Sequence, residues 1–169
     1  MDTLDAIFTR RSIRKYTDRA VPDDLVSQLL KAAMAAPSAG NEQAWQFIVI
    51  RDRALLDAIP KFHPYSAMLK YASMAVLVCG DLTLEKYKGY WVQDCSAAAQ
   101  NLLLAATAQG LGAVWTGVYP MEDRVAGMRK LLNLPEHVIP LSLLPIGYPA
   151  EQPAQTDRFN TERVYKDRW

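Results

Sequence analysis

The chain has 169 residues, of which 19 are basic and 18 acidic, and half of all residues are hydrophobic. This composition is that of one globular domain and excludes a disordered, collagen-like or coiled-coil chain. The net charge of +1 gives no general attraction to nucleic acid or to an acidic surface. We therefore expect a single domain over residues 1–169 and no nucleic-acid partner.

The sequence carries no signal for metal binding, export or membrane insertion. Two cysteines and two histidines are too few for a spaced zinc motif or a disulfide framework. The first residues include acids and do not resemble a secretory signal, and no run approaches the ~18 apolar residues of a membrane span. We expect a soluble cytoplasmic protein with no metal site and no membrane partner.

The first half of the chain predicts three helices and two strands. Apolar residues recur at helical spacing over residues 2–10, and an amphipathic helix begins at Pro22 and is ended by Pro37. Runs rich in β-formers at 46–51 and 74–80 predict strands, and a helix over 53–59 lies between them. Residues 61–70 show no clear pattern.

The second half begins with the longest helical candidate, residues 92–109, stopped by Gly110 and Gly112. Its apolar residues go almost all the way round, which indicates burial on nearly every side and favours a dimer contact. A strand over 113–119, a helix over 122–132 and a strand over 138–148 interrupted by prolines follow. The tail, 150–169, is polar but ends with apolar residues that need a surface: Phe159, Val164, Tyr165 and Trp169.

The one strong local charge lies between residues 10 and 19, where five basic residues face a single acid, Asp18. Arg10, Ser12 and Arg14 alternate, so in an extended chain their side chains point the same way. Two guanidinium groups and a hydroxyl on one face suit a phosphate dianion. A solvated basic turn is the alternative interpretation.

The loop over residues 37–43 contains only proline, small, acidic and amide residues. Asn41 and Gln43 each offer a donor and an acceptor, which suits the edge of a planar heterocycle. Ordinary turn chemistry explains the same composition equally well.

The glycines between residues 110 and 117 do not form a known nucleotide loop. The dinucleotide fingerprint needs glycine where Trp115 stands, and the P-loop needs lysine where Val118 stands. Gly117, inside a predicted strand, instead indicates close approach by something flat. Because no acid, base or nucleophile is evident, a bound cofactor would have to carry any chemistry.

These segments together resemble the flavin-dependent nitroreductase family in its compact single-domain form. The resemblance rests on residues 10–16, 36–45, 94–104 leading into 110–115, and 145–149. It implies an α+β fold, an antiparallel-rich mixed sheet flanked by helices. It also implies an intertwined homodimer whose tail, 150–169, wraps onto the partner subunit, with FMN at the subunit interface.

The resemblance also implies roles for single residues. Arg10, Ser12 and Arg14 would hold the FMN phosphate and ribityl chain, and Arg158 would complete the phosphate site. Pro37, Ser38 and Asn41 would come from the other subunit, and Thr116, Gly117 and Val118 would line the ring. The full set of expected cofactor-binding residues is Arg10, Arg11, Ser12, Arg14, Pro37, Ser38, Asn41, Gln43, Thr116, Gly117, Val118 and Arg158, with no catalytic side chain.

Three positions depart from the family pattern. Ala44 stands where the family usually has proline, Thr156 where it often has a second basic residue, and Val118 where glycine is frequent.

The implied activity is that of an NAD(P)H oxidoreductase. It would work by ping-pong hydride transfer through the N5 atom of FMN to a small-molecule acceptor such as a nitroaromatic or a quinone. The alternatives are a flavin-binding module for storage or sensing, and an enzyme that transforms the flavin itself.

Overall fold

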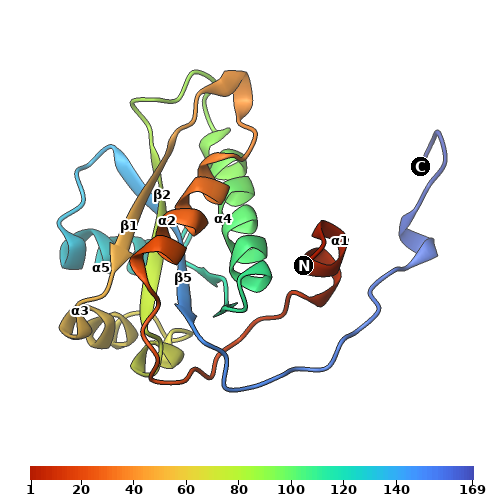
Figure 1. Ribbon diagram of the computed structural model, residues 1–169. Coiled ribbons are helices and arrows are strands. Elements are labelled where there is room, and N and C mark those ends of the chain that lie inside the picture. The colour runs from red at the N-terminus through yellow and green to blue at the C-terminus, as the bar shows by residue number, and fades with distance from the viewer.

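The computed structural model describes all residues, 1–169, as an α+β protein built on one sheet (Figure 1). The order of the main strands is β1-β2-β5-β3, and β4 also pairs with β5. Every strand pair is antiparallel, and the one parallel pairing is an isolated bridge between Ser12 and Ala113. The bounds of the strands are β1 Trp45–Ile50, β2 Met74–Asp81, β3 Gly112–Ala113, β4 Thr116–Gly117 and β5 Val138–Gly147.

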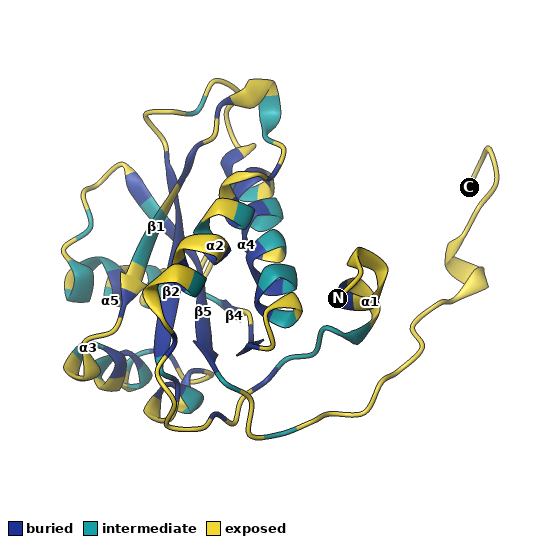
Figure 2. Ribbon diagram, in the orientation of Figure 1, coloured by how far each residue is buried: buried dark blue, intermediate teal, exposed yellow.

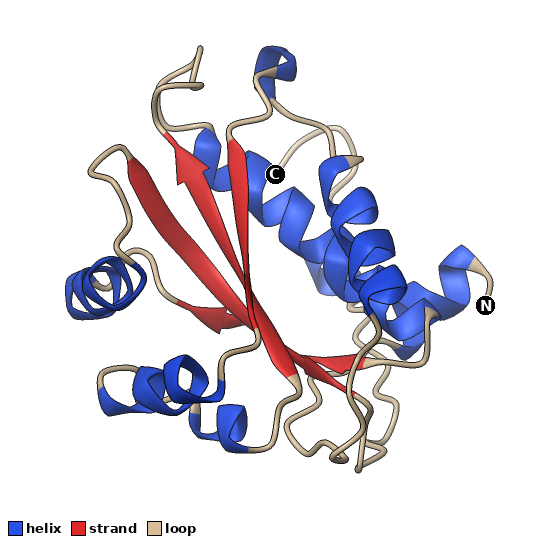
Figure 3. Cartoon of the chain, turned by 60° about the vertical axis from the view of Figure 1, so that its left-hand side comes forward, coloured by secondary structure: helices blue, strands red, loops and turns tan.

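Helices cover both faces of the sheet (Figure 3). α2 (Asp23–Met34) and α4 (Trp91–Ala108) pack on one face, and α3 (Arg53–Ala58) and α5 (Glu122–Leu132) lie on the other. Alternate side chains of β2 enter the two cores, so the whole strand is buried (Figure 2). This explains why its sequence is a continuous apolar run. The predicted antiparallel-rich sheet flanked by helices is confirmed.

The structure corrects two of the predicted strands. Residues 113–119 are not one strand but the short strands β3 and β4, separated where Trp115 turns partly to solvent. The last strand is not interrupted by its prolines, because β5 runs unbroken through Pro140 and Pro145. A shift in the register between β2 and β5 beside Pro140 accommodates the ring as a β-bulge.

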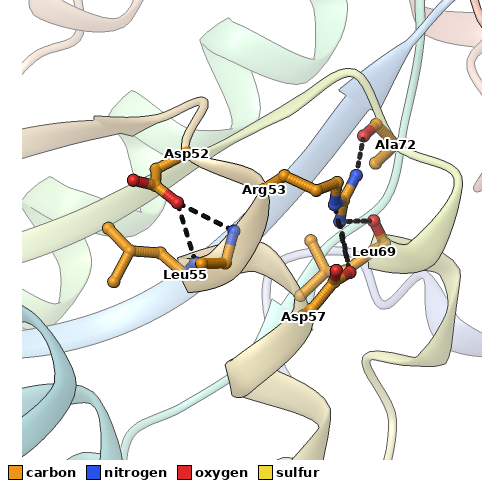
Figure 4. A network of polar contacts seen from close by, with 7 residues as sticks. Asp52, Arg53, Leu55, Asp57, Leu69 and Ala72 are labelled. Carbon is orange, nitrogen blue, oxygen red and sulfur yellow. Dashed lines mark hydrogen bonds and ion pairs between the residues drawn. The ribbon is translucent and has the colours of Figure 1, made fainter.

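A polar network fixes the poorly patterned stretch after β1 (Figure 4). The Asp52 carboxylate accepts hydrogen bonds from the backbone N–H groups of Ala54 and Leu55, at 2.7 and 3.2 Å, and so caps α3. The Arg53 guanidinium pairs with Asp57 and donates to the carbonyls of Leu69 and Ala72. In the stretch that follows, Ile59–Lys61 and Ala67–Lys70 each form a short 3-10 turn.

The two ends of the chain leave the body on the same side (Figure 1). α1 (Thr3–Thr9) exposes Leu4, Ile7 and Phe8, and every residue from 152 to 169 is exposed. Glu151 anchors the start of the tail by accepting the backbone N–H groups of Arg14 and Lys15. Within one chain, the apolar residues at the end of the tail have no surface to pack on, and Trp169 is 97% exposed.

Both thiols lie inside the body. The Cys95 thiol of α4 donates to the carbonyl of Cys79 in β2, with 3.3 Å between the heavy atoms. Burial raises the pKa of Cys79 to about 12 and raises that of Cys95 further. None of the helices combines the length and the apolar character that crossing a bilayer requires.

Candidate functional site

Three arginines line one cavity of about 510 Å³ between α1 and the tail: Arg10, Arg11 and Arg158. Burial, together with the positive charges of Arg158 and Arg11, lowers the pKa of Arg10. The two ion pairs of the chain lie elsewhere, at Arg51–Asp23 and Arg53–Asp57. Asp157 also lines the cavity, but its carboxylate accepts the N–H of Phe159 and forms no ion pair with these arginines. The cavity therefore holds an excess of positive charge, which suits an anion with several oxygens.

The three arginines are not equivalent. The Arg11 guanidinium donates to the carbonyls of Phe8, Arg10 and Ala154, at 2.9, 2.8 and 3.2 Å. It thus joins the end of α1 to the tail and is already occupied. Arg10 and Arg158 keep their donors for a ligand.

Arg14 lies apart from Arg10. It lines a second cavity, of about 460 Å³, whose wall includes Trp115, Gly117 and Arg124. The predicted common face of residues 10, 12 and 14 requires a fully extended chain, but only Ser12 forms a bridge, to Ala113. The structure therefore brings Arg10 and Arg158 together and places Arg14 beside β4 instead.

The β4 segment offers its backbone rather than its side chains. The Thr116 hydroxyl donates to the carbonyl of Leu143 at 2.7 Å, and the Val118 side chain is fully buried. At Gly117, by contrast, an added Cβ would meet nothing within 4 Å. Gly117 thus leaves room for a flat group to lie against the strand.

Two residues that the sequence analysis did not identify hold the backbone carbonyl group of Gly117. Its carbonyl accepts hydrogen bonds from His63 Nε2 and from the Arg124 guanidinium, both at 3.0 Å. Burial and the charge of Arg124 lower the pKa of His63, so the ring is neutral and carries its proton on Nε2. No local signal marked either residue, because His63 lies in the unpatterned stretch and Arg124 has the pattern of an ordinary helix surface.

The loop over residues 37–43 is strained and internally bonded. Gly40, Asn41 and Gln43 all have positive φ, at 53°, 53° and 51°. The Gln43 side chain donates to Asn41 Oδ1 at 2.8 Å, and the Gln43 backbone N–H donates to Ser38 Oγ at 3.1 Å. Left-handed residues other than glycine persist where surrounding contacts enforce them, which is typical of functional loops.

This loop lies away from the arginine cavities within one chain. Pro37 and Ser38 line a separate cavity of about 280 Å³ with Tyr90 and Asp94. Figure 1 places the loop near one end of α4 and residues 10–16 near the other. Apart from Ser12, which forms a bridge to Ala113 of β3, the predicted residues therefore fall into three groups: the arginine cavity, the β4 segment and this loop.

Comparison with known proteins agrees with this architecture. The sequence profile of the Nitroreductase family matches residues 7–77 and 67–148. A protein of Methanothermobacter thermautotrophicus, provisionally named an NADH dehydrogenase/NAD(P)H nitroreductase, is 59% identical over 169 residues. The alignment covers 100% of this chain and 88% of that protein. The chain belongs to the nitroreductase family, as the resemblance indicated.

Two solved structures share the fold. A crystal structure from Parabacteroides distasonis, with the same provisional name, is 44% identical and superposes with a TM-score of 0.95, covering 99% of this chain and 98% of its own. A provisionally named nitroreductase of Desulfovibrio desulfuricans, solved in complex with FMN, is 33% identical with a TM-score of 0.87, covering 100% and 98%. The predicted fold class is thereby confirmed.

Proposed function

We propose that this protein is an FMN-dependent NAD(P)H oxidoreductase that reduces a nitroaromatic, quinone or similar acceptor. The observation that carries the proposal is the cavity in which Arg10 and Arg158 lie together without a carboxylate partner. The FMN bound by the Desulfovibrio relative and the NAD(P)H in the name of the Methanothermobacter relative support it.

The donors of this chain fit FMN. A phosphate dianion between Arg10 and Arg158 would offset the burial and the repulsion that together lower the pKa of Arg10. The ring of the same molecule would lie along the open surface of Gly117, with Arg14 at that cavity. Arg11 would act indirectly, by holding the tail that carries Arg158.

The site also requires a second copy of the chain. We propose a homodimer in which the loop over residues 37–43 of one subunit, with Pro37, Ser38, Asn41 and Gln43, reaches the cofactor of the other. In this dimer the tail lies on the partner. The exposed apolar residues of α1 and of the tail support this assignment, because such a collection is expected to be covered.

When bound, FMN supplies at N5 the centre that accepts and gives hydride. The protein then needs to bind the cofactor, to orient it and to tune its reactivity. The positive charge of Arg14 would stabilise negative charge on the bound cofactor, and His63 and Arg124 fix the Gly117 backbone. Tyr65 and Trp115 of this cavity are 68% and 36% exposed, which supports a ping-pong cycle in which NAD(P)H and the acceptor would enter in turn.

The decisive experiment is anaerobic titration of the purified holoprotein with NADH and with NADPH. We expect prompt loss of the oxidised flavin absorbance with at least one donor, and its return on addition of a quinone or a nitroaromatic. Absorbance that persists with both donors would contradict the proposal and favour a storage or sensing module. A flavin of altered mass after the cycle would instead indicate an enzyme that transforms the flavin.

A further inference from the structure

Two carboxyl groups are buried together beneath the loop over residues 37–43. Glu42, within the loop, is 7% exposed, and Asp94, in the first turn of α4, is 4% exposed. Neither forms an ion pair with an arginine or lysine. Buried carboxyl groups are rare unless they are paired, so the contacts of these two require an explanation.

Each carboxyl group uses one oxygen to hold backbone. Glu42 Oε2 accepts the N–H groups of Lys86 and Tyr87, at 2.6 and 3.1 Å. Asp94 Oδ1 accepts the N–H group of Ala39, at 3.0 Å. The pair therefore connects three segments that are distant in sequence: the loop, α4 and residues 85–90.

The remaining oxygen of each carboxyl group has no partner outside the pair. Glu42 Oε1 and Asp94 Oδ2 are buried and receive no hydrogen bond from any other residue, while the two side chains lie within hydrogen-bonding reach. Two ionised carboxylates have no hydrogen to place between them, so both oxygens would remain unsatisfied. A single proton between the oxygens satisfies both, as in other closely spaced buried carboxyl pairs.

The proton belongs on Asp94. Burial and the negative charge of Glu42 raise the pKa of Asp94 despite the hydrogen bond from Ala39. Burial alone would raise the pKa of Glu42 as well. The N–H groups of Lys86 and Tyr87 and the hydrogen bond from Asp94 outweigh burial and lower it. These directions favour a hydrogen bond in which protonated Asp94 donates to ionised Glu42.

We propose that Glu42 and Asp94 share one proton and that this hydrogen bond positions the loop over residues 37–43. The neighbouring segment reinforces the arrangement. Lys86 Nζ donates to the carbonyl of Gly40 at 3.2 Å, and the Tyr87 ring fills the space that a Cβ on Gly40 would occupy. Only the purpose of this positioning, presentation of the loop to a partner's FMN, rests on the proposed function.

The groups around the pair set the direction of its pH dependence. Glu85, whose Oε1 accepts the N–H groups of Gly89 and Trp91, adds negative charge and favours the protonated form of Asp94. Lys86 favours the ionised form of Glu42, and the Cys95 thiol beside them is neutral. A group with a raised pKa stabilises the fold until the pH passes that pKa, whereas a group with a lowered pKa does so until the pH falls below it. The loop is therefore held most firmly between the two values, and it loosens as the pH rises through the raised pKa of Asp94 and both carboxyl groups ionise.

The experiment follows the backbone N–H resonances of Ala39, Lys86 and Tyr87 through a pH titration of the full-length protein by NMR. We expect all three to shift together in one transition above the ordinary carboxyl range, because they report the same proton. Asp94→Asn should abolish this transition, since its amide donates permanently to Glu42 while its oxygen still accepts from Ala39. Glu42→Gln should move it to lower pH, because Asp94 still titrates but loses the negative charge that helps to hold its proton.

Glu85→Gln is the matched control, because it removes a neighbouring charge but leaves the pair intact. Its transition should persist and move to lower pH. Separate transitions of the three resonances within the ordinary carboxyl range, or an unchanged transition in Asp94→Asn, would overturn the shared proton.

The positioning role is tested by FMN affinity over the same pH range. We expect the affinity of the wild type to fall through the NMR transition and that of Asp94→Asn to stay level. If the FMN affinity of the wild type did not change through the pH range of the NMR transition, the positioning role would be overturned. A chain that shows the transition but binds no FMN at any pH would overturn the proposed function and leave the shared proton intact.

Discussion

The loop over residues 37–43 and the tail over 150–169 supply two parts of the candidate site in opposite ways. The loop is short, strained and tied down by backbone, amide and carboxyl hydrogen bonds. The tail is exposed almost throughout, and beyond Glu151 its only hydrogen bond to the rest of the chain joins Ala154 to Arg11. One part is shaped before any ligand arrives, whereas the other needs a ligand or a second subunit to hold it.

The loop and the tail therefore differ in how much conformational entropy each loses on binding. A preformed loop loses little conformational entropy when a ligand arrives, whereas ordering a free tail subtracts from the affinity. Changes in the loop should therefore appear in the stability of the chain itself. Changes in the tail should appear only in FMN affinity and in the oligomeric state.

Removal of residues 156–169 should have the largest effect. Because this segment has no buried residue, we expect the body to unfold at an unchanged temperature. FMN affinity should fall by more than about a hundredfold, since Arg158 is lost together with the contacts to the partner. Calorimetry measures the unfolding temperature, flavin fluorescence measures the FMN affinity, and sedimentation measures the oligomeric state. A lower unfolding temperature of the isolated monomer would show that the tail belongs to the body after all.

Arg10→Ala and full-length Arg158→Ala come next. Each removes a charge-assisted contact of about 1.5–3 kcal/mol, or roughly a tenfold to hundredfold weaker affinity for FMN. Arg163→Ala is the matched control, because it removes an exposed arginine of the same tail. Riboflavin, which has no phosphate, should bind all three variants and the wild type alike.

Arg14→Ala should behave differently from Arg10→Ala. Since Arg14 lines the cavity beside Gly117, its loss should weaken riboflavin and FMN by a similar factor of roughly ten. Equilibrium dialysis with both ligands measures this. If the variant retained riboflavin and FMN as well as the wild type does, Arg14 would not belong to the cofactor site.

Gly40→Ala should destabilise the chain itself. Its φ of +53° disfavours alanine by about 1–2 kcal/mol. The new Cβ would also lie 2.4 Å from the Tyr87 ring. Gly110→Ala is the control, because φ is +73° there but nothing lies within 4 Å of the Cβ. Chemical denaturation should give the greater loss for Gly40→Ala, and equal losses would mean that Tyr87 does not brace the loop.

Asp81→Asn should have the smallest effect, visible mainly as pH dependence. Burial alone would raise the pKa of Asp81, but hydrogen bonds from the Thr83 hydroxyl and N–H outweigh it and lower the pKa. The wild type should therefore lose stability as the pH falls through this lowered pKa, whereas the variant should lose less. Denaturation midpoints across acid pH measure the difference, which we expect to be about 1 kcal/mol or less. If the stabilities of the variant and the wild type changed with pH in parallel, Asp81 would not be the source of the pH dependence.

The fold could be predicted from the sequence wherever one periodicity dominated. The helix over 122–132 was predicted with the bounds of α5, and the run at 74–80 matches β2 to within a residue. The strand over 113–119 could not be divided in advance, because Trp115 leaves the sheet within an otherwise β-rich run.

The candidate site was less predictable because it depends on contacts between distant segments. The basic run pointed to an anion and the family resemblance placed Arg158 with Arg10, but only the structure shows that Arg14 lines a different cavity, beside Gly117. His63 and the pairing of Glu42 with Asp94 have no local pattern at all. Their roles arise from which segments the fold brings together.

The two buried thiols give the chain a built-in reporter. With the pKa of Cys79 near 12 and that of Cys95 higher, the folded protein presents no reactive thiolate at neutral pH. Alkylation of Cys95 by a thiol reagent therefore requires α4 to separate from β2, whereas alkylation of Cys79 requires the core on the other face of the sheet to open. The rate of labelling, followed by mass spectrometry, therefore reports these openings without any engineered probe.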